Sequence, residues 1–199
     1  MYNCLFQLSL SGTYTAPWIT TVKQTLDQCG LSYIWAEQKC VNVNWLKMLV
    51  GQRLKDQFLQ TWHGELQCMS SCDFFCEIKD GLKLEKYLLG ESVKSRQALC
   101  NLRLSNSRIP KVTGRYKGLE RNKRFCNLCT GDFIGDEFHI LFECKNQIIT
   151  ANRKKFLPRY YISHPSMFKC IELLQSSNEK VLYKLGVFLS VVLPLFKYL

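Results

Sequence analysis

Three cysteines and one histidine in the second half of the chain follow the spacing Cys-x2-Cys-x9-His-x4-Cys. They are Cys126, Cys129, His139 and Cys144. Zinc prefers four sulfur and imidazole donors in a tetrahedral arrangement, and spacings of this kind are typical of structural zinc sites. The alternative is three buried thiols and a hydrogen-bonded histidine, because a chain with 11 Cys contains cysteine pairs by chance. Since only 3 His occur in the chain, the placement of one at ligand spacing favours a single structural Zn²⁺.

The residues around these four predict their local structure. A Cys-x2-Cys segment forms a tight turn that directs both thiolates toward one point, and Gly131 suits the positive φ with which the chain leaves that turn. Residues 136–142 are expected to form one or two helical turns, with acidic residues at the N-terminal end. Residues five apart do not share a face of an α-helix. We therefore expect Cys144 at the point where that helix ends.

Composition limits the class of protein. A chain of 199 residues with 47% hydrophobic and 13% aromatic residues is expected to fold. An odd number of cysteines without regular spacing favours a reducing compartment, and the N-terminus lacks the basic start of a signal peptide. The apolar run over 185–196 is too short to cross a bilayer and predicts a buried helix. We expect an intracellular protein with no membrane segment, leaving nucleus and cytoplasm both open.

Positive charge is concentrated in the second half. Residues 1–107 carry 11 Lys/Arg and 9 Asp/Glu, whereas residues 108–199 carry 16 and 7. Within 108–159 there are 12 basic and 5 acidic residues, so the excess surrounds the predicted metal site. A surplus of this size is typical of proteins with an acidic partner, most often nucleic acid.

The hydrophobic periodicity predicts a mainly α-helical fold. Helices are expected over 18–29 after Pro17, over 44–62 with Asn44 as N-cap and an apolar stripe facing the core, over 92–104, and over 146–157. Residues 107–118 are predicted to be a loop because Pro110, Gly114 and Gly118 interrupt them, and 72–78 fit a strand or a helix equally well. We expect a helical platform over 1–107, a basic zinc-stapled module over 108–160 and a C-terminal helical pair over 161–199.

Two basic clusters flank the predicted zinc site. The first leads directly into Cys126, and the second follows Cys144. Cations neutralise phosphates and aromatic rings stack on bases, so these clusters predict contact with RNA or DNA, although a solvated loop and a charged helix face are the plainer alternative. The predicted contact residues are Lys111, Arg115, Tyr116, Lys117, Arg121, Lys123, Arg124, Arg153, Lys154 and Lys155.

Other candidate chemistry is weaker. His63, Cys68, Cys72 and Cys76 form a second group of donors, but one helix cannot wrap three ligands around an ion. No paired catalytic aspartates, glycine-rich phosphate loop or nucleophile elbow is present in the sequence. Four protein ligands would also leave the zinc no open position. We therefore expect a protein that is not an enzyme.

The region around the cysteines resembles the post-polymerase tail of LINE-type (non-LTR) retrotransposon reverse transcriptases. The resemblance is strongest from about 100 to 165 and covers most of the chain. It is carried by 102–110, 113–116, 124–129, 135–144, 153–160 and 164–165, with further matches at 31–35 and 52–58.

This resemblance implies a function for the module. In that family Cys126, Cys129, His139 and Cys144 would hold zinc, and the tail would help the enzyme to grip its RNA template or DNA target. The catalytic aspartates and the endonuclease would lie outside the chain, so we expect a nucleic-acid-binding fragment, with the rest of a reverse transcriptase as a further partner. The alternative is an architectural module that docks on the polymerase body without touching nucleic acid.

Overall fold

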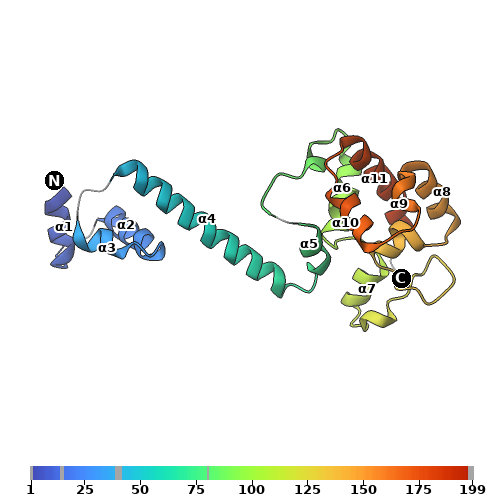
Figure 1. Ribbon diagram of the computed structural model, residues 1–199. Helices are drawn as coiled ribbons and strands as arrows, with labels where there is room; N and C mark the ends of the chain where they lie inside the picture. Colours follow the sequence, from blue (N-terminus) through green and yellow to red (C-terminus); the bar gives the residue numbers. More distant parts are fainter. Residues whose placement is uncertain (1, 14–15, 39–41, 80, 197–199) are drawn as a thin grey trace. The chain divides into compact units, whose positions relative to one another are not determined.

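Helices make up almost all of the regular structure. The computed structural model describes residues 2–13, 16–38, 42–79 and 81–196 (Figure 1). Within these ranges the only β-type pairing is one isolated antiparallel bridge between Phe125 and Ile134. The prediction of a mainly α-helical fold is therefore confirmed. The chain divides into two compact units, residues 1–64 and residues 65–199.

The N-terminal unit is built from short helices around a small core. It contains α1 (Tyr2–Leu10), α2 (Pro17–Gln28), α3 (Ser32–Glu37) and most of α4 (Val43–Cys68). Phe6 and Trp35 meet edge to face, with ring centroids 5.1 Å apart, and Ile19 and Leu26 of α2 are buried beside them. The predicted helix after Pro17 is confirmed, and Gly30 follows it with φ of 67°.

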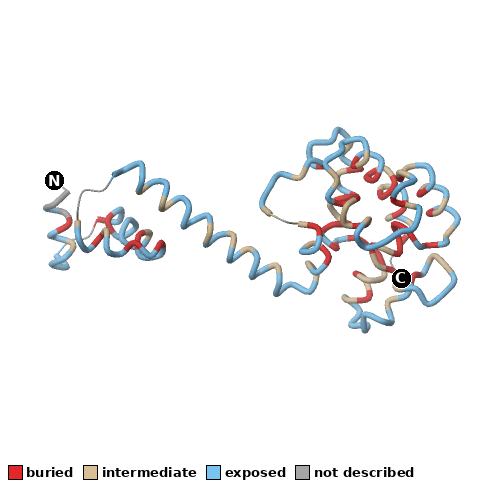
Figure 2. The backbone as a smooth tube through the Cα atoms, viewed as in Figure 1, coloured by how far each residue is buried: buried red, intermediate tan, exposed pale blue. Residues whose placement is uncertain are grey.

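Helix α4 was correctly predicted to be a helix, but its N-cap residue and the burial of its apolar stripe were not. Asn42 rather than Asn44 caps it, since the Asn42 side-chain oxygen accepts hydrogen bonds from the backbone of Asn44 and Trp45. The expectation that its apolar stripe faces a core is wrong, because no residue of α4 is buried (Figure 2). Met48 and Phe58 are 75% and 59% exposed. Only Leu46, Leu49 and Val50 pack against the N-terminal core.

The C-terminal unit has its own core, centred on α11 (Glu179–Val192). Leu185, Phe188, Leu189 and Val192 of this helix are fully buried, so the prediction of a buried helix in this apolar run is confirmed. Helix α6 (Val93–Arg103) packs most closely on it. The other helical elements are α5 (Asp73–Ile78), η1 (Lys86–Leu89), α7 (Pro110–Tyr116), η2 (Arg121–Lys123), η3 (His139–Glu143), α8 (Gln147–Phe156), α9 (Arg159–Ile162), α10 (Met167–Gln175) and η4 (Leu193–Leu195).

Three features of this unit differ from, or decide between, the sequence-based expectations. Residues 110–116 form α7 instead of a loop, because Pro110 occupies the first helical turn, where a missing N–H costs nothing. Residues 73–78 form a helix and not a strand. The predicted boundary at 107/108 falls between α6 and α7, inside a unit whose single core runs from Phe74 to Phe196. No helix in the described ranges has the length and apolar character needed to span a membrane.

Candidate metal centre

A short hairpin presents the first two cysteines. The backbone N–H of Cys126 donates to the carbonyl of Phe133 at 2.8 Å, and that of Gly135 donates to the carbonyl of Arg124 at 2.9 Å. Between these bonds the chain turns at Gly131, whose φ of 129° favours glycine. The predicted role of Gly131 is therefore confirmed. A Cβ atom at this position would lie 2.8 Å from the Phe133 ring.

A wide helical turn presents the other two donors. The Asp136 carboxylate accepts a hydrogen bond from the backbone N–H of His139 at 2.8 Å and begins the turn. Element η3 is π-helical, and the N–H of Cys144 donates to the carbonyl of His139 at 2.7 Å, five residues back. Cys144 caps the end of this element, as predicted. The π-type hydrogen bond brings residues 139 and 144 together, which an α-helical turn would not do.

The four side chains converge on one point. All four donor atoms lie within 4.8 Å of one another. Cys126 Sγ is 3.9 Å from Cys144 Sγ, and Cys129 Sγ is 3.4 Å from His139 Nε2. Tetrahedral zinc with ordinary bond lengths places two sulfurs about 3.8 Å apart and a sulfur and a nitrogen about 3.6 Å apart. The observed spacing fits such an ion without rearrangement of the backbone.

The histidine ring is held in the orientation that a ligand needs. Nδ1 of His139 is buried and has no hydrogen-bond partner in the described residues, and Glu143 Oε2 lies 3.6 Å from it. Phe133 stacks on the ring, with centroids 5.5 Å apart and planes 19° from parallel. A metal on Nε2 would keep the proton on Nδ1, where it points toward the Glu143 carboxylate, as the second ring nitrogen of metal-bound histidines commonly does.

Two of the thiols are hydrogen-bonded to each other. A hydrogen bond from the Cys144 thiol lowers the pKa of Cys126 to about 3, against the opposing effect of burial. The same hydrogen bond, followed by burial, raises the pKa of Cys144. A thiolate is the form of cysteine that binds metal, so this hydrogen bond favours the binding form of Cys126.

Buried polar side chains fix the elements that carry the ligands. The Arg153 guanidinium donates to the carbonyls of Leu141, Ile140 and Cys144, at 2.7, 3.2 and 3.1 Å. Burial lowers the pKa of Arg153. The Asn146 amide donates to the carbonyl of Leu128 at 3.1 Å, while its side-chain oxygen caps α8. Arg153 therefore ties α8 to the π turn, and Asn146 ties the start of α8 to the turn that carries Cys126 and Cys129.

Only some of the predicted nucleic-acid contacts come together. Lys111, Arg115, Arg121 and Arg124 line one cavity of about 200 Å³, beside Ser70, Ser71 and Ser105. Tyr116, Lys117 and Lys123 are exposed on the same segment. Lys154 is exposed, and Lys155 lines a different pocket. Arg153 is buried and bonded to three carbonyls, so it acts within the fold and not on the surface.

Two of the converging cations are already bound to the protein. Lys111 Nζ lies 2.8 Å from the buried Glu137 carboxylate. Arg124 donates through Nε and Nη2 to the carbonyl of Leu119 and through Nη1 to that of Lys111. These contacts brace α7 against the hairpin. Arg115 and Arg121 are the cavity's remaining arginines, and Arg115 lies over the Tyr116 ring at 5.2 Å.

The second group of cysteines does not form a site. Helix α4 ends at Cys68, and Cys72 precedes α5, so the three cysteines do not share one helix face. In the parts of the chain that the structure describes, Cys126, Cys129, His139 and Cys144 are the only group of three or more potential ligands.

Sequence reasoning missed the residues that support the four candidate ligands. Glu143 stands four positions after His139, which is a spacing that a search for a carboxylate partner could have used. Asn146 is recognisable as an N-cap two residues after the last cysteine, but its bond to Leu128 is not. Phe133 lies in the turn between the second cysteine and the histidine, and nothing in the sequence places it on the imidazole.

Comparisons with known proteins identify no relative: no family model, no curated protein and no solved structure matches the chain. The resemblance to LINE-type reverse transcriptases therefore rests on its sequence motifs alone.

Proposed function

We propose that Cys126, Cys129, His139 and Cys144 hold one structural Zn²⁺. The observation that carries this proposal is the convergence of three sulfurs and one imidazole nitrogen within 4.8 Å. A full set of four protein ligands leaves no position for a substrate, which supports a structural and non-catalytic ion. The ion would join the hairpin to the π turn, and it would displace the protons of the Cys129 and Cys144 thiols.

Native mass spectrometry of the intact chain, before and after chelation, tests the zinc proposal. We expect one zinc per chain, and loss of far-UV helical signal when it is removed. Cys129→Ser should lose the metal, whereas the matched control Cys76→Ser, at an exposed thiol outside the cluster, should retain it. Retention of zinc and of the melting curve in Cys129→Ser would show that the ligand assignment is wrong.

We further propose that the basic surface around α7 and η2 binds nucleic acid through its phosphates. Arg115, Arg121 and Arg124 meet at one small cavity, which supports this reading over scattered solvated charges, whereas Glu137 balances the charge of Lys111 in the same cavity. Serine hydroxyls beside these cations suit phosphate oxygens. Tyr116, which is 76% exposed and carries Arg115 over its ring, is available to stack on a base. With few side chains available to read base edges, we expect little sequence specificity.

The salt dependence of oligonucleotide binding tests this second proposal. Fluorescence anisotropy with a single-stranded DNA and an RNA of equal length should give affinities that fall steeply with salt. Arg115→Glu and Arg121→Glu should each weaken binding about tenfold and leave zinc content unchanged. The matched control is Lys94→Glu, at an exposed position of α6 outside this surface. Equal affinity at low and moderate salt, or equal effects of Lys94→Glu and Arg121→Glu, would contradict it.

Arg124 is a poor test of the same surface. Its guanidinium donates to the carbonyls of Leu119 and Lys111, so reversing its charge would disturb α7 itself. A loss of binding in Arg124→Glu would not distinguish a phosphate contact from a damaged module.

The second candidate function is docking on another protein. It is favoured by apolar side chains on the same module, since Leu119, Phe125 and Phe133 are each more than 40% exposed. In a LINE-type reverse transcriptase the module would pack through them on the polymerase body. Leu119→Ser and Phe125→Ser separate the two functions, because they should leave oligonucleotide affinity unchanged and weaken only a protein contact.

A further inference from the structure

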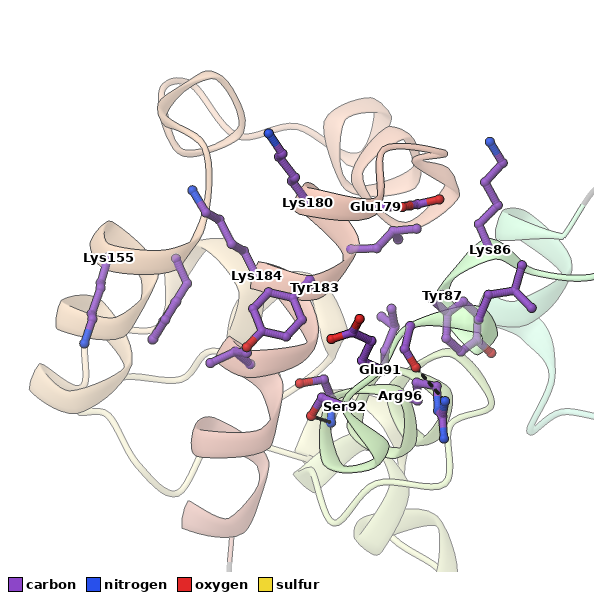
Figure 3. Close-up of a pocket in the computed structure, with 17 residues that line it drawn as sticks. Lys86, Tyr87, Glu91, Ser92, Arg96, Lys155, Glu179, Lys180, Tyr183 and Lys184 are labelled. Carbon is purple, nitrogen blue, oxygen red and sulfur yellow. Dashed lines mark hydrogen bonds between the residues drawn. The ribbon is translucent and has the colours of Figure 1, made fainter.

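A second and larger pocket lies on the C-terminal unit, apart from the zinc cluster. Its volume is about 740 Å³, and it is lined by residues of 86–99, 155–156 and 179–187. Figure 3 shows Lys86 at one side and Lys155 at the other, with Tyr183 of α11 between them. We call it the α6–α11 pocket. Its size is within the range of sites that bind small ligands or the side chains of a peptide.

The rim of the α6–α11 pocket is positively charged. Five cations line it against the two carboxylates Glu91 and Glu179, which leaves a net charge of +3. In the described part of the chain, Lys86, Lys180 and Lys184 form no ion pair. Arg96 donates to the carbonyl of Gly90. The lysines are therefore available to an acidic partner.

The lining between these cations is apolar, with four aliphatic side chains (Leu89, Leu99, Leu182 and Val187) and three aromatic ones (Tyr87, Phe156 and Tyr183). Leu89 is 70% exposed and Tyr183 is 56% exposed, which leaves apolar surface open to solvent. Leu99 and Leu182, which are buried, and the half-buried Val187 also line the pocket. Such a surface gains free energy by covering aliphatic or aromatic side chains. It offers little to nucleobases, because Tyr87 is buried and Phe156 is half-buried, which leaves Tyr183 as the exposed aromatic residue of this lining.

We propose that the α6–α11 pocket binds an acidic, amphipathic peptide segment of a partner protein. Carboxylates of the peptide would meet the lysines of the rim, and its apolar side chains would enter the pocket. A second copy of this chain is a poor occupant, because two copies that each carry a formal net charge of +11 repel one another. The inference does not depend on nucleic-acid binding or on zinc.

A designed peptide provides the direct test. The probe is a fluorescein-labelled peptide of about 16 residues, with glutamates on one helical face and leucines at i, i+3, i+4 and i+7 on the other. The control has the same composition in an order that breaks the leucine spacing. With the intact chain at low ionic strength, we expect the patterned peptide to bind at least about tenfold more tightly than the control in fluorescence anisotropy.

Two pairs of neighbouring residues assign the binding to the pocket. Lys155 lines the pocket and Lys154 does not. Lys155→Glu should therefore lower the affinity for the patterned peptide about fivefold or more, whereas Lys154→Glu should change that affinity less than twofold. Leu89 lines it and Leu88 does not. Leu89→Ser should therefore weaken binding while Leu88→Ser does not. Both members of each pair are exposed, so folding should be preserved.

Four results would overturn the proposal. Equal affinity for the two peptides would indicate simple charge attraction without the pocket. Equal effects of Lys154→Glu and Lys155→Glu would place the contact elsewhere. Displacement of the peptide by a single-stranded oligonucleotide would assign the pocket to nucleic acid. No binding at about 1 mM peptide would show that the pocket does not bind acidic peptide segments. Oligonucleotide binding that leaves the peptide in place would agree with two separate sites.

Discussion

Arg124 illustrates how a surface cation in the sequence becomes a structural residue in the fold. Its side chain crosses α7 at Gly114, and a Cβ atom on Gly114 would lie 2.6 Å from Arg124 Cγ and 2.9 Å from Cδ. The guanidinium cannot move aside freely because it donates to two backbone carbonyls. The glycine that looked like a helix breaker is instead the position that admits the arginine.

We predict that Gly114→Ala destabilises the C-terminal unit by about 1–3 kcal/mol, the usual cost of overpacking. In an Arg124→Ala background only the Cβ atom remains, 3.3 Å away, so the same substitution should cost far less. Urea unfolding of both single variants and the double variant measures this coupling. Additive effects of the two substitutions would contradict the proposed contact.

Cys170 is a buried thiol without a ligand role. It lies in the core of the C-terminal unit on α10. Burial, with a smaller contribution from Glu137 and Asp136, raises its pKa from 9.0 to about 12. The unfolded chain would therefore release this proton at a lower pH than the folded protein does. Stability from Cys170 is complete below about pH 9 and is lost as the pH rises toward 12.

We predict that the wild-type protein loses about 1 kcal/mol more stability between pH 8 and pH 10 than Cys170→Ala does. The variant is less stable at both pH values because it leaves a cavity, so the informative quantity is the difference in slope. Urea unfolding at the two pH values measures it. Parallel pH profiles for the two proteins would show that Cys170 does not titrate as its burial implies.

At the scale of elements, the α6–α11 contact holds the C-terminal core together. The two helices approach so closely at Gly186 that a Cβ atom there would lie 2.7 Å from Ser95 Cβ and 2.8 Å from the Ser95 carbonyl oxygen. A backbone carbonyl inside a helix cannot rotate away. Any side chain at position 186 must therefore push the helices apart.

We predict that Gly186→Ala destabilises the C-terminal unit by about 1–3 kcal/mol, despite the higher helix propensity of alanine. The matched control is Gly81→Ala, in the same unit, where no atom lies within 4 Å of the added methyl group. That substitution should change the free energy of unfolding by less than about 0.5 kcal/mol. Equal losses of stability at the two positions would show that the close approach of α6 and α11 is not the reason why Gly186→Ala destabilises the unit.

Elements with clear end signals could be predicted from the sequence, and others could not. Pro17 and Asn146 mark the starts of α2 and α8, because a proline in the first turn and a side-chain cap act locally. The group of four side chains that converge within 4.8 Å followed from spacing alone. Element η3 could not be predicted as π-helical, since its wide turn depends on Asp136, on Arg153 bonded to its carbonyls and on the surrounding core. Helix α7 was missed because the partner that requires Gly114 lies ten residues further on.

For the whole molecule, periodicity identifies an apolar face but not what covers it. The stripe on α4 has helical spacing, yet Met48, Leu54 and Phe58 are exposed. The C-terminal core, in contrast, draws its residues from 74 to 196 and shares none with the N-terminal core. The boundary predicted at 107/108 therefore does not coincide with the division at 64/65 into two compact units.

This difference predicts where the chain can be shortened. A fragment of residues 65–199 keeps the complete C-terminal core and the four candidate zinc ligands, so its melting temperature should lie within a few degrees of the corresponding transition in the full chain. A fragment of residues 108–199 lacks α6, whose buried Leu99 and Leu102 pack in the core with α11. It should fail to fold even with zinc present.

Circular dichroism and native mass spectrometry of both fragments measure helical content and bound metal together. A folded, zinc-binding 108–199 fragment would restore the boundary that composition indicates and would show that the zinc module is stable without the helices packed around it.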